Sequence, residues 1–206
     1  MPPPADDPLK TDLLSLKPPI FVAKWFVEKT PHIFAGNAGA HVEWRRSVAD
    51  ALGVSLFDLV IVGSAALGKS LNPAKVLASF DHESDVDIAV ISDHYFDIAW
   101  RWMRRLGADK YRLPREAQEW VKEHESRLVY WGSIATDQLL PHMPFGPEWV
   151  KQLAAFSAKP PVDGREINVR LYRDHASLES YLARSVRKAR TVLDVKEDDK
   201  EEDTDE

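Results

Sequence analysis

The chain has 206 residues, of which 44% are hydrophobic and 29% are charged, a balance typical of globular rather than disordered or membrane-embedded proteins. The absence of cysteine excludes disulfide bonds and thiolate metal sites, and no apolar run approaches the roughly 18 residues of a membrane-spanning helix. The formal charge is −6, but residues 194–206 carry nine acidic and two basic side chains; removing their −7 leaves +1 for the rest.

The two ends of the chain are predicted to lie outside the folded core. Residues 1–18 are rich in proline and polar side chains, which favours an extended lead-in. The first ten residues lack the basic and apolar regions of a secretory signal, so we expect a soluble, cytoplasmic protein without a membrane partner. Residues 194–206 are mostly acidic and are expected to form a disordered tail. One domain, residues 19–193, is left between them.

Hydrophobic periodicity predicts the elements of this domain. Helices are expected where apolar residues recur every three or four positions: 20–29, 37–52, 95–106, 115–140 with an interruption near Gly132, 147–159 and 175–193. Strands are expected at three apolar or alternating runs: 56–62, 85–91 and 166–172. The predicted fold is therefore α/β (or α+β), with a small mixed β-sheet wrapped by N- and C-terminal helices.

The loop after the first predicted strand matches a known phosphate-binding pattern. Residues 63–70, GSAALGKS, fit G-x-x-x-x-G-K-[ST], in which Lys69 would bind phosphates as in a P-loop NTPase. Three features disfavour that interpretation. Asn72-Pro73 stand where the P-loop helix should continue, the strands are few, and Asp85 and Asp87 begin their strand, whereas a Walker-B acid ends one.

Asp85 and Asp87 are the strongest candidates for a metal site. They stand two residues apart on a predicted strand, so both side chains leave the same face. Two nearby carboxylates repel each other, and a hard cation such as Mg²⁺ (or Mn²⁺) removes that penalty. Gly63 lets the backbone approach a phosphate, and Ser64 adds a hydroxyl among the free N–H groups of a helix start. The sequence therefore predicts a combined metal and nucleotide site.

This arrangement resembles the DNA polymerase β-like nucleotidyltransferase superfamily. The resemblance covers about residues 56–91 and is carried by Val62-Gly63-Ser64 and by Ser84-Asp85-Val86-Asp87, which begins the next strand. It implies that Gly63 and Ser64 contact the triphosphate of ATP or another nucleoside triphosphate, and that Asp85 and Asp87 bind Mg²⁺ or Mn²⁺ and are catalytic. The implied reaction is transfer of a nucleoside monophosphate to an RNA, protein or small-molecule acceptor.

Within that superfamily, the chain is most similar to the minimal bacterial nucleotidyltransferases. Members of this group often act in toxin–antitoxin or phage-defence pairs, so the resemblance also implies a partner protein. Active members place a third carboxylate on a later strand. On the predicted strand 166–172 the candidate is Glu166, with Asp163 in the preceding loop as a second choice, because the more central Asn168 is neutral. Without a third carboxylate, the chain would be a catalytically degenerate nucleotide-binding or adaptor subunit.

The remaining basic and aromatic residues have two interpretations each. Lys69 could touch a phosphate on either interpretation of the loop. A basic stripe on the last helix is either a solvated face or a groove for a triphosphate or an RNA backbone: Arg184, Arg187, Lys188 and Arg190. Most of the seven tryptophans are expected to pack in the core rather than to stack on bases.

Overall fold

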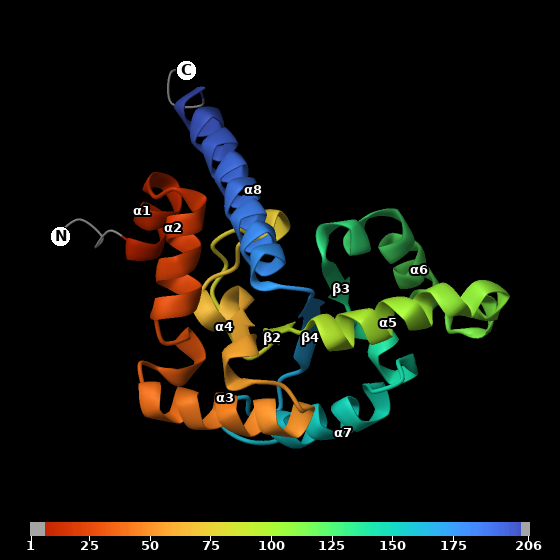
Figure 1. Ribbon diagram of the computed structural model, residues 1–206. Helices are drawn as coiled ribbons and strands as arrows, with labels where there is room; N and C mark the ends of the chain where they lie inside the picture. Colours follow the sequence, from red (N-terminus) through yellow and green to blue (C-terminus); the bar gives the residue numbers. More distant parts are fainter. Residues whose placement is uncertain (1–6, 203–206) are drawn as a thin grey trace.

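The computed structural model describes residues 7–202, with side chains through residue 195, and shows a mixed α/β fold around a four-stranded sheet (Figure 1). The strands are β1 (Leu59–Val62), β2 (Val86–Ile91), β3 (Ser133–Ala135) and β4 (Ile167–Tyr172), in the order β1-β2-β4-β3. β1 is antiparallel to β2, β4 is parallel to β2, and β3 is antiparallel to β4. The predicted mixed sheet is confirmed.

The central strand β2 is buried along almost its whole length. Val86, Ile88, Ala89 and Val90 have no exposed surface, and only Asp87 interrupts the run. In the parallel pair with β4, Asp87 lies opposite Asn168. A parallel pair needs a long connection between its strands, and the segment between β2 and β4 contains α5 (Asp93–Leu106), α6 (Arg115–Glu123), β3 and α7 (Gly146–Ser157).

Helices surround this sheet. Their bounds are α1 (Pro8–Ser15), α2 (Pro18–Val22), α3 (Ala38–Leu52), α4 (Gly63–Leu67), α5 (Asp93–Leu106), α6 (Arg115–Glu123), α7 (Gly146–Ser157) and α8 (His175–Glu202). A π-helical turn, Ala23–Glu28, continues α2, so the predicted helix over residues 20–29 is present. Asn37 caps α3 by accepting from the Ala40 N–H through its side chain, and Gly53 ends the helix in a left-handed conformation. Among residues 7–202 no helix is long and apolar enough to cross a membrane.

Both ends of the chain contain more helix than predicted. The expected extended lead-in, residues 1–18, is wrong for residues 8–15, because α1 buries Leu9 and Leu13 in the core. Arg190 of α8 holds this helix by donating to the carbonyl groups of Leu13 and Leu16. The expected disordered tail, residues 194–206, is wrong for its first part, because α8 continues without a break to Glu202. Residues 1–6 and 203–206 lie outside the described residues.

The segment predicted as mostly helical, residues 115–140, contains an unpredicted strand. After α6 the chain passes through a π-helical turn (His124–Leu128) and a 3-10 turn, η7 (Val129–Trp131), and then forms β3. The fully buried His124 holds this strand: its Nε2 accepts from the Ala135 N–H at 3.0 Å, and its Nδ1 donates to the Trp120 carbonyl at 2.6 Å. β3 has only three residues, too few for a periodic pattern.

Candidate functional site

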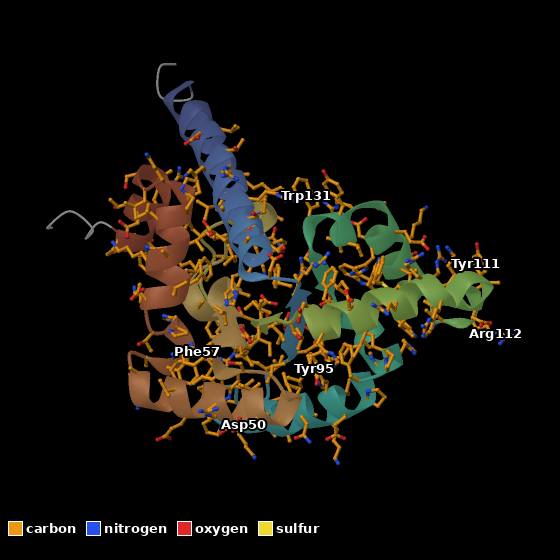
Figure 2. The ribbon with its side chains drawn as sticks, viewed as in Figure 1. Asp50, Phe57, Tyr95, Tyr111, Arg112 and Trp131 are labelled. Carbon is orange, nitrogen blue, oxygen red and sulfur yellow. The ribbon has the colours of Figure 1, made fainter. Side chains whose placement is uncertain are left out.

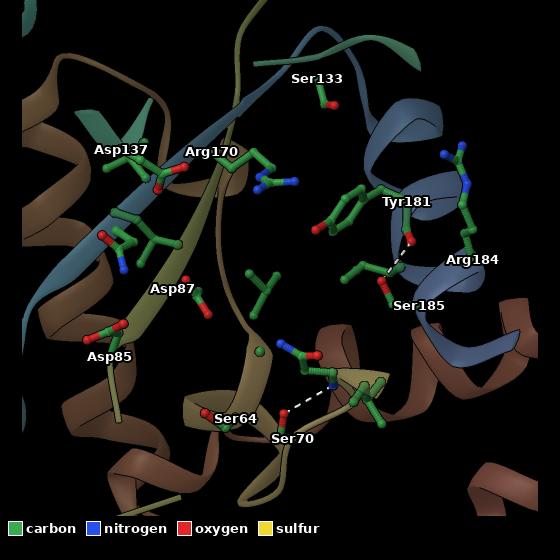
Figure 3. A pocket seen from close by; sticks show the side chains of 18 of the residues that line it. Ser64, Ser70, Asp85, Asp87, Ser133, Asp137, Arg170, Tyr181, Arg184 and Ser185 are labelled. Atoms are coloured by element: carbon green, nitrogen blue, oxygen red, sulfur yellow. Dashed lines mark hydrogen bonds between the residues drawn. The ribbon is translucent and has the colours of Figure 1, made fainter. Parts of the chain in front are cut away.

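A cavity of about 950 Å³ lies where β1 ends and β2 begins, with α8 along one wall (Figure 3). Gly63 and Ser64 line it at the end of β1, and Asp85 and Asp87 line it at the start of β2. Asn168 and Arg170 line it from β4. The four residues in which the sequence predicts a nucleotide and metal site therefore share one cavity of the size of a small-molecule site.

The contact between Gly63 and Asp87 joins the two halves of the predicted motif. Val62 lies opposite Asp87 in the antiparallel pair, so the next residue, Gly63, passes directly beside the carboxylate. A Cβ built on Gly63 would lie 2.5 Å from Asp87 Oδ2, and the backbone there has a φ of +65°. The left-handed backbone therefore favours glycine at this position, and any larger residue would have to displace the Asp87 carboxylate. Ser64 follows in the first turn of α4 and lines the same cavity.

Three of the carboxylates that line the cavity interact through their charges: Asp85, Asp87 and Asp137. Burial raises the pKa of Asp87 to about 6; Arg170 opposes the shift, and the charges of Asp85 and Asp137 add to it. Burial also raises the pKa of Asp137, again opposed by Arg170 and reinforced by Asp85. Among the described side chains, residues 7–195, no hydrogen bond to the Asp87 carboxylate is found. Its negative charge is therefore offset only by the charges of Arg170 and Lys75 and by no hydrogen-bond donor among these residues.

Asp137 is a site residue that the sequence analysis missed. It follows β3, whose pairing with β4 sets Ala135 opposite Arg170. The Thr136 hydroxyl donates to the Val169 carbonyl at 2.8 Å and fixes the chain just before Asp137. No sequence pattern singles this aspartate out, since its position depends on a strand of three residues and on a long-range pairing.

Arg170, on β4, is one of the cations that line the cavity. Its guanidinium carbon lies 4.8 Å from the centre of the Tyr181 ring on α8, and Figure 3 shows it between Asp137 and Tyr181. Burial works against its charge, but Tyr181, Tyr172, Asp137 and Asp87 together raise its pKa. Arg170 thus keeps its charge in a half-buried position beside the carboxylates.

The predicted third ligand, Glu166, is not brought to the cavity. It is exposed, stands just before β4, and does not line the cavity, although its carbonyl accepts from the Val86 N–H at 2.9 Å. Asp163 lies in the loop before it, also exposed. Within the described part of the chain no group of three or more His, Cys, Asp or Glu side chains is arranged to hold a metal ion.

Lys69 does not line the cavity and forms an ion pair with Asp7, with 2.5 Å between Nζ and Oδ2. The local backbone also differs from that of a P-loop. There the loop precedes the helix, and the Lys-Ser pair opens it. Here α4 begins at Gly63 and is ended by Gly68 at a φ of +78°, so Lys69 and Ser70 follow the helix.

The basic stripe on α8 is divided between two roles. Arg184 and Lys188 line the cavity. Arg190 donates to carbonyl groups at the end of α1, and Arg187 is exposed. Lys75 lines the cavity as well and lowers the pKa of Asp87. The cavity therefore combines carboxylates at the start of β2 with the cations of α8 and Lys75. This charge distribution suits a ligand made of a metal ion and phosphates.

The carboxylate oxygens of Asp85 and Asp87 fit Mg²⁺ or Mn²⁺ as ligands. Mg²⁺ is usually bound by one or two carboxylates, with substrate phosphates and water completing the octahedron. Asp85 and Asp87 supply that number, and the Asp87 carboxylate accepts no hydrogen bond from the described side chains that would compete with a cation. A cage of three protein carboxylates is not required.

Comparisons of the chain with family models, curated proteins and solved structures gave no match. Any function must therefore be inferred from the residues of the cavity.

Proposed function

We propose that this chain is a nucleotidyltransferase, which uses Mg²⁺ or Mn²⁺ to transfer a nucleoside monophosphate from a nucleoside triphosphate to an acceptor. The observation that carries the proposal is the close approach of Gly63 to Asp87, because it joins the turn after β1 to a half-buried carboxylate in one cavity. The small mixed sheet, with β1 antiparallel and β4 parallel to β2, supports a fold of the nucleotidyltransferase type.

Each group of residues has a role in binding. Asp85 and Asp87 ligate the metal that accompanies the triphosphate, and the backbone at Gly63 and the hydroxyl of Ser64 contact the phosphates. Lys75, which lines the cavity and lowers the pKa of Asp87, attracts the triphosphate. A metal held by Asp85 and Asp87 would supply positive charge, which neutralises the phosphates and favours ionisation of the attacking hydroxyl.

The transfer step follows from this arrangement. An acceptor hydroxyl oxygen attacks the α-phosphorus and forms a new P–O bond. The bond from that phosphorus to the oxygen bridging the α- and β-phosphates breaks, and pyrophosphate leaves with the electron pair. In this proposal Asp137, which lines the cavity, accepts the hydroxyl proton, and Arg170 offsets negative charge as it develops. Most of the catalytic effect is positioning and charge neutralisation, as in phosphoryl transfer generally.

The proposal is tested by incubating the protein with each α-³²P-labelled nucleoside triphosphate and Mg²⁺ or Mn²⁺, with and without RNA. We expect label on an acceptor and release of pyrophosphate, both abolished by Asp85→Asn or Asp87→Asn. Absence of transfer under every combination would contradict the proposal. A cytoplasmic location and a partner protein of the toxin–antitoxin or phage-defence kind are expectations from the resemblance and form part of this proposal.

A second candidate function is nucleotide binding without turnover, as in an adaptor subunit. It is favoured by one observation: the residue opposite Asp87 on β4 is the neutral Asn168, where a third carboxylate would stand. In that case the wild-type protein binds nucleotide and metal but transfers nothing, and Asn168→Asp creates activity by adding a charged ligand.

A further inference from the structure

An aromatic ring and a guanidinium form a bridge between the two walls of the cavity. Trp131 belongs to η7 and lines the cavity, yet 46% of its surface is exposed. Arg184 comes from α8, and its guanidinium carbon lies 3.9 Å from the centre of the Trp131 ring. Figure 2 shows Trp131 beside α8. We call this pair the Trp131–Arg184 platform.

The backbone behind the platform is tied to α8. Gly132 has a φ of +67°, and a Cβ there would collide with Ser177 on α8. The Gly132 carbonyl accepts from the Arg173 N–H at 3.0 Å. Tyr130, 84% exposed, sets its ring 5.1 Å from that of Trp131. Two large aromatic side chains are thus presented to solvent from a constrained turn, so little ordering is needed when a ligand stacks on them.

The charges around the platform favour a polyanion. Arg184 and Lys188 stand one turn apart on α8 and both line the cavity. Neither forms an ion pair with any side chain described in the structure. Lys75 lines the cavity as well. Exposed aromatic rings combined with unpaired cations along a groove are the features by which proteins bind single-stranded nucleic acids, whose bases stack and whose phosphates pair with cations. A double helix keeps its bases stacked inside and offers the rings much less.

We propose that the Trp131–Arg184 platform binds the end of a single-stranded nucleic acid, and that this strand is the acceptor. A base stacks on the exposed face of Trp131, and backbone phosphates pair with Arg184 and Lys188. The terminal hydroxyl oxygen then bonds to the α-phosphorus of the nucleotide, pyrophosphate leaves with the electron pair of the broken P–O bond, and the hydroxyl proton passes to Asp137. The transfer step rests on the proposed function, whereas binding of the strand does not.

Binding is measured by fluorescence anisotropy with a labelled oligouridylate and a labelled oligothymidylate, each of about 12 nucleotides, in EDTA and without nucleotide. Because stacking on one aromatic ring contributes about 1–3 kcal/mol, Trp131→Ala should weaken binding by at least about fivefold, and Trp131→Phe should retain most of the affinity. Lys188→Ala should weaken binding and reduce its salt dependence by roughly one phosphate contact.

The matched control is Tyr111→Ala. Tyr111 is also exposed (71%) and also lies near a cation, with Lys110 Nζ 5.8 Å from the centre of its ring, but it does not line the cavity. This variant should bind oligonucleotide like wild type. Equal losses in Tyr111→Ala and Trp131→Ala would overturn the proposal, as would failure of wild type to bind either oligonucleotide at low salt.

Two outcomes separate this inference from the proposed function. If Trp131→Ala weakens binding of a fluorescent nucleoside triphosphate with Mg²⁺ but not of the oligonucleotides, the platform holds the nucleotide's own base and the inference is wrong. If the double variant Asp85→Asn/Asp87→Asn and wild type both bind oligonucleotide, and neither binds metal–nucleotide, the proposed function fails while the platform stands.

Discussion

Replacement of Asp87 by asparagine should stabilise the metal-free protein at neutral pH. Burial raises the pKa of Asp87 from 3.8 to about 6, with Asp85 and Asp137 adding to the shift. A shift of about 2 units means that the ionised carboxylate destabilises the fold by about 3 kcal/mol relative to the neutral form. Asparagine is neutral at every pH and removes this penalty. A side chain that lowers the stability of the fold, as Asp87 does, is expected at a functional site.

The sign of the effect gives it a pH signature. Below pH 3.8 the carboxyl group is protonated in both the folded and the unfolded chain, so wild type and Asp87→Asn should be equally stable. From there to about pH 6 the wild type loses its proton in the unfolded state first, and its relative stability falls. Above about pH 6 the advantage of the variant should be constant, at about 3 kcal/mol.

The assay is urea unfolding from pH 4 to pH 8 in EDTA. Glu179→Gln is the control, because this exposed carboxylate on α8 should change the free energy of unfolding by no more than about 0.5 kcal/mol at any pH. Mg²⁺ with nucleotide should stabilise wild type and not Asp87→Asn, since only a ligand bound to the folded state stabilises it. A variant that is less stable than wild type at pH 7–8, or a difference independent of pH, would refute the reasoning.

Three further predictions concern the residues around the cavity. Gly63→Ala should abolish nucleotide binding and lower the melting temperature. Gly36 also has a left-handed backbone, but a Cβ there would meet nothing within 4 Å. Gly36→Ala should therefore lose only about 1–3 kcal/mol of stability through backbone strain and should bind nucleotide normally. Asp137→Asn should slow single-turnover transfer at least about tenfold and Glu166→Gln less than about twofold; the reverse order would restore Glu166 as the third ligand. Lys69→Ala should leave nucleotide affinity within about twofold of wild type, because the ion pair of Lys69 with Asp7 lies outside the cavity. If the wild type hydrolyses ATP to ADP and this variant does not, the loop is a P-loop.

Local patterns predicted the parts of the fold that depend on local physics. The helix over residues 38–52 begins at an asparagine cap and ends at a left-handed glycine, and both signals are visible in the sequence. The runs that form β2 and β4 were located within one residue, because continuous or alternating apolar residues determine burial. The first strand starts later than expected, since Leu56–Asp58 form a 3-10 turn capped by the Ser55 hydroxyl.

Long-range contacts decided the rest. β3 depends on His124, eleven residues before Ala135, and on pairing with β4, so no pattern within the strand reveals it. The position of Asp137 follows from that pairing, because it stands two residues after the end of β3. Among residues 1–18 the prolines suggested an extended chain, but Pro8 stands in the first turn of α1, where proline is tolerated, and contact with α8 stabilises the helix.

The most direct measurement is a titration of the protein with a fluorescent nucleoside triphosphate, in Mn²⁺ and in EDTA. The same titration is made on Asp85→Asn/Asp87→Asn. If the cavity at Gly63 and Asp87 is a metal–nucleotide site, wild type binds only with Mn²⁺, electron paramagnetic resonance shows Mn²⁺ bound together with the nucleotide, and the double variant loses at least about tenfold in affinity. Nucleotide binding that is equally strong in EDTA and in the double variant would contradict this assignment.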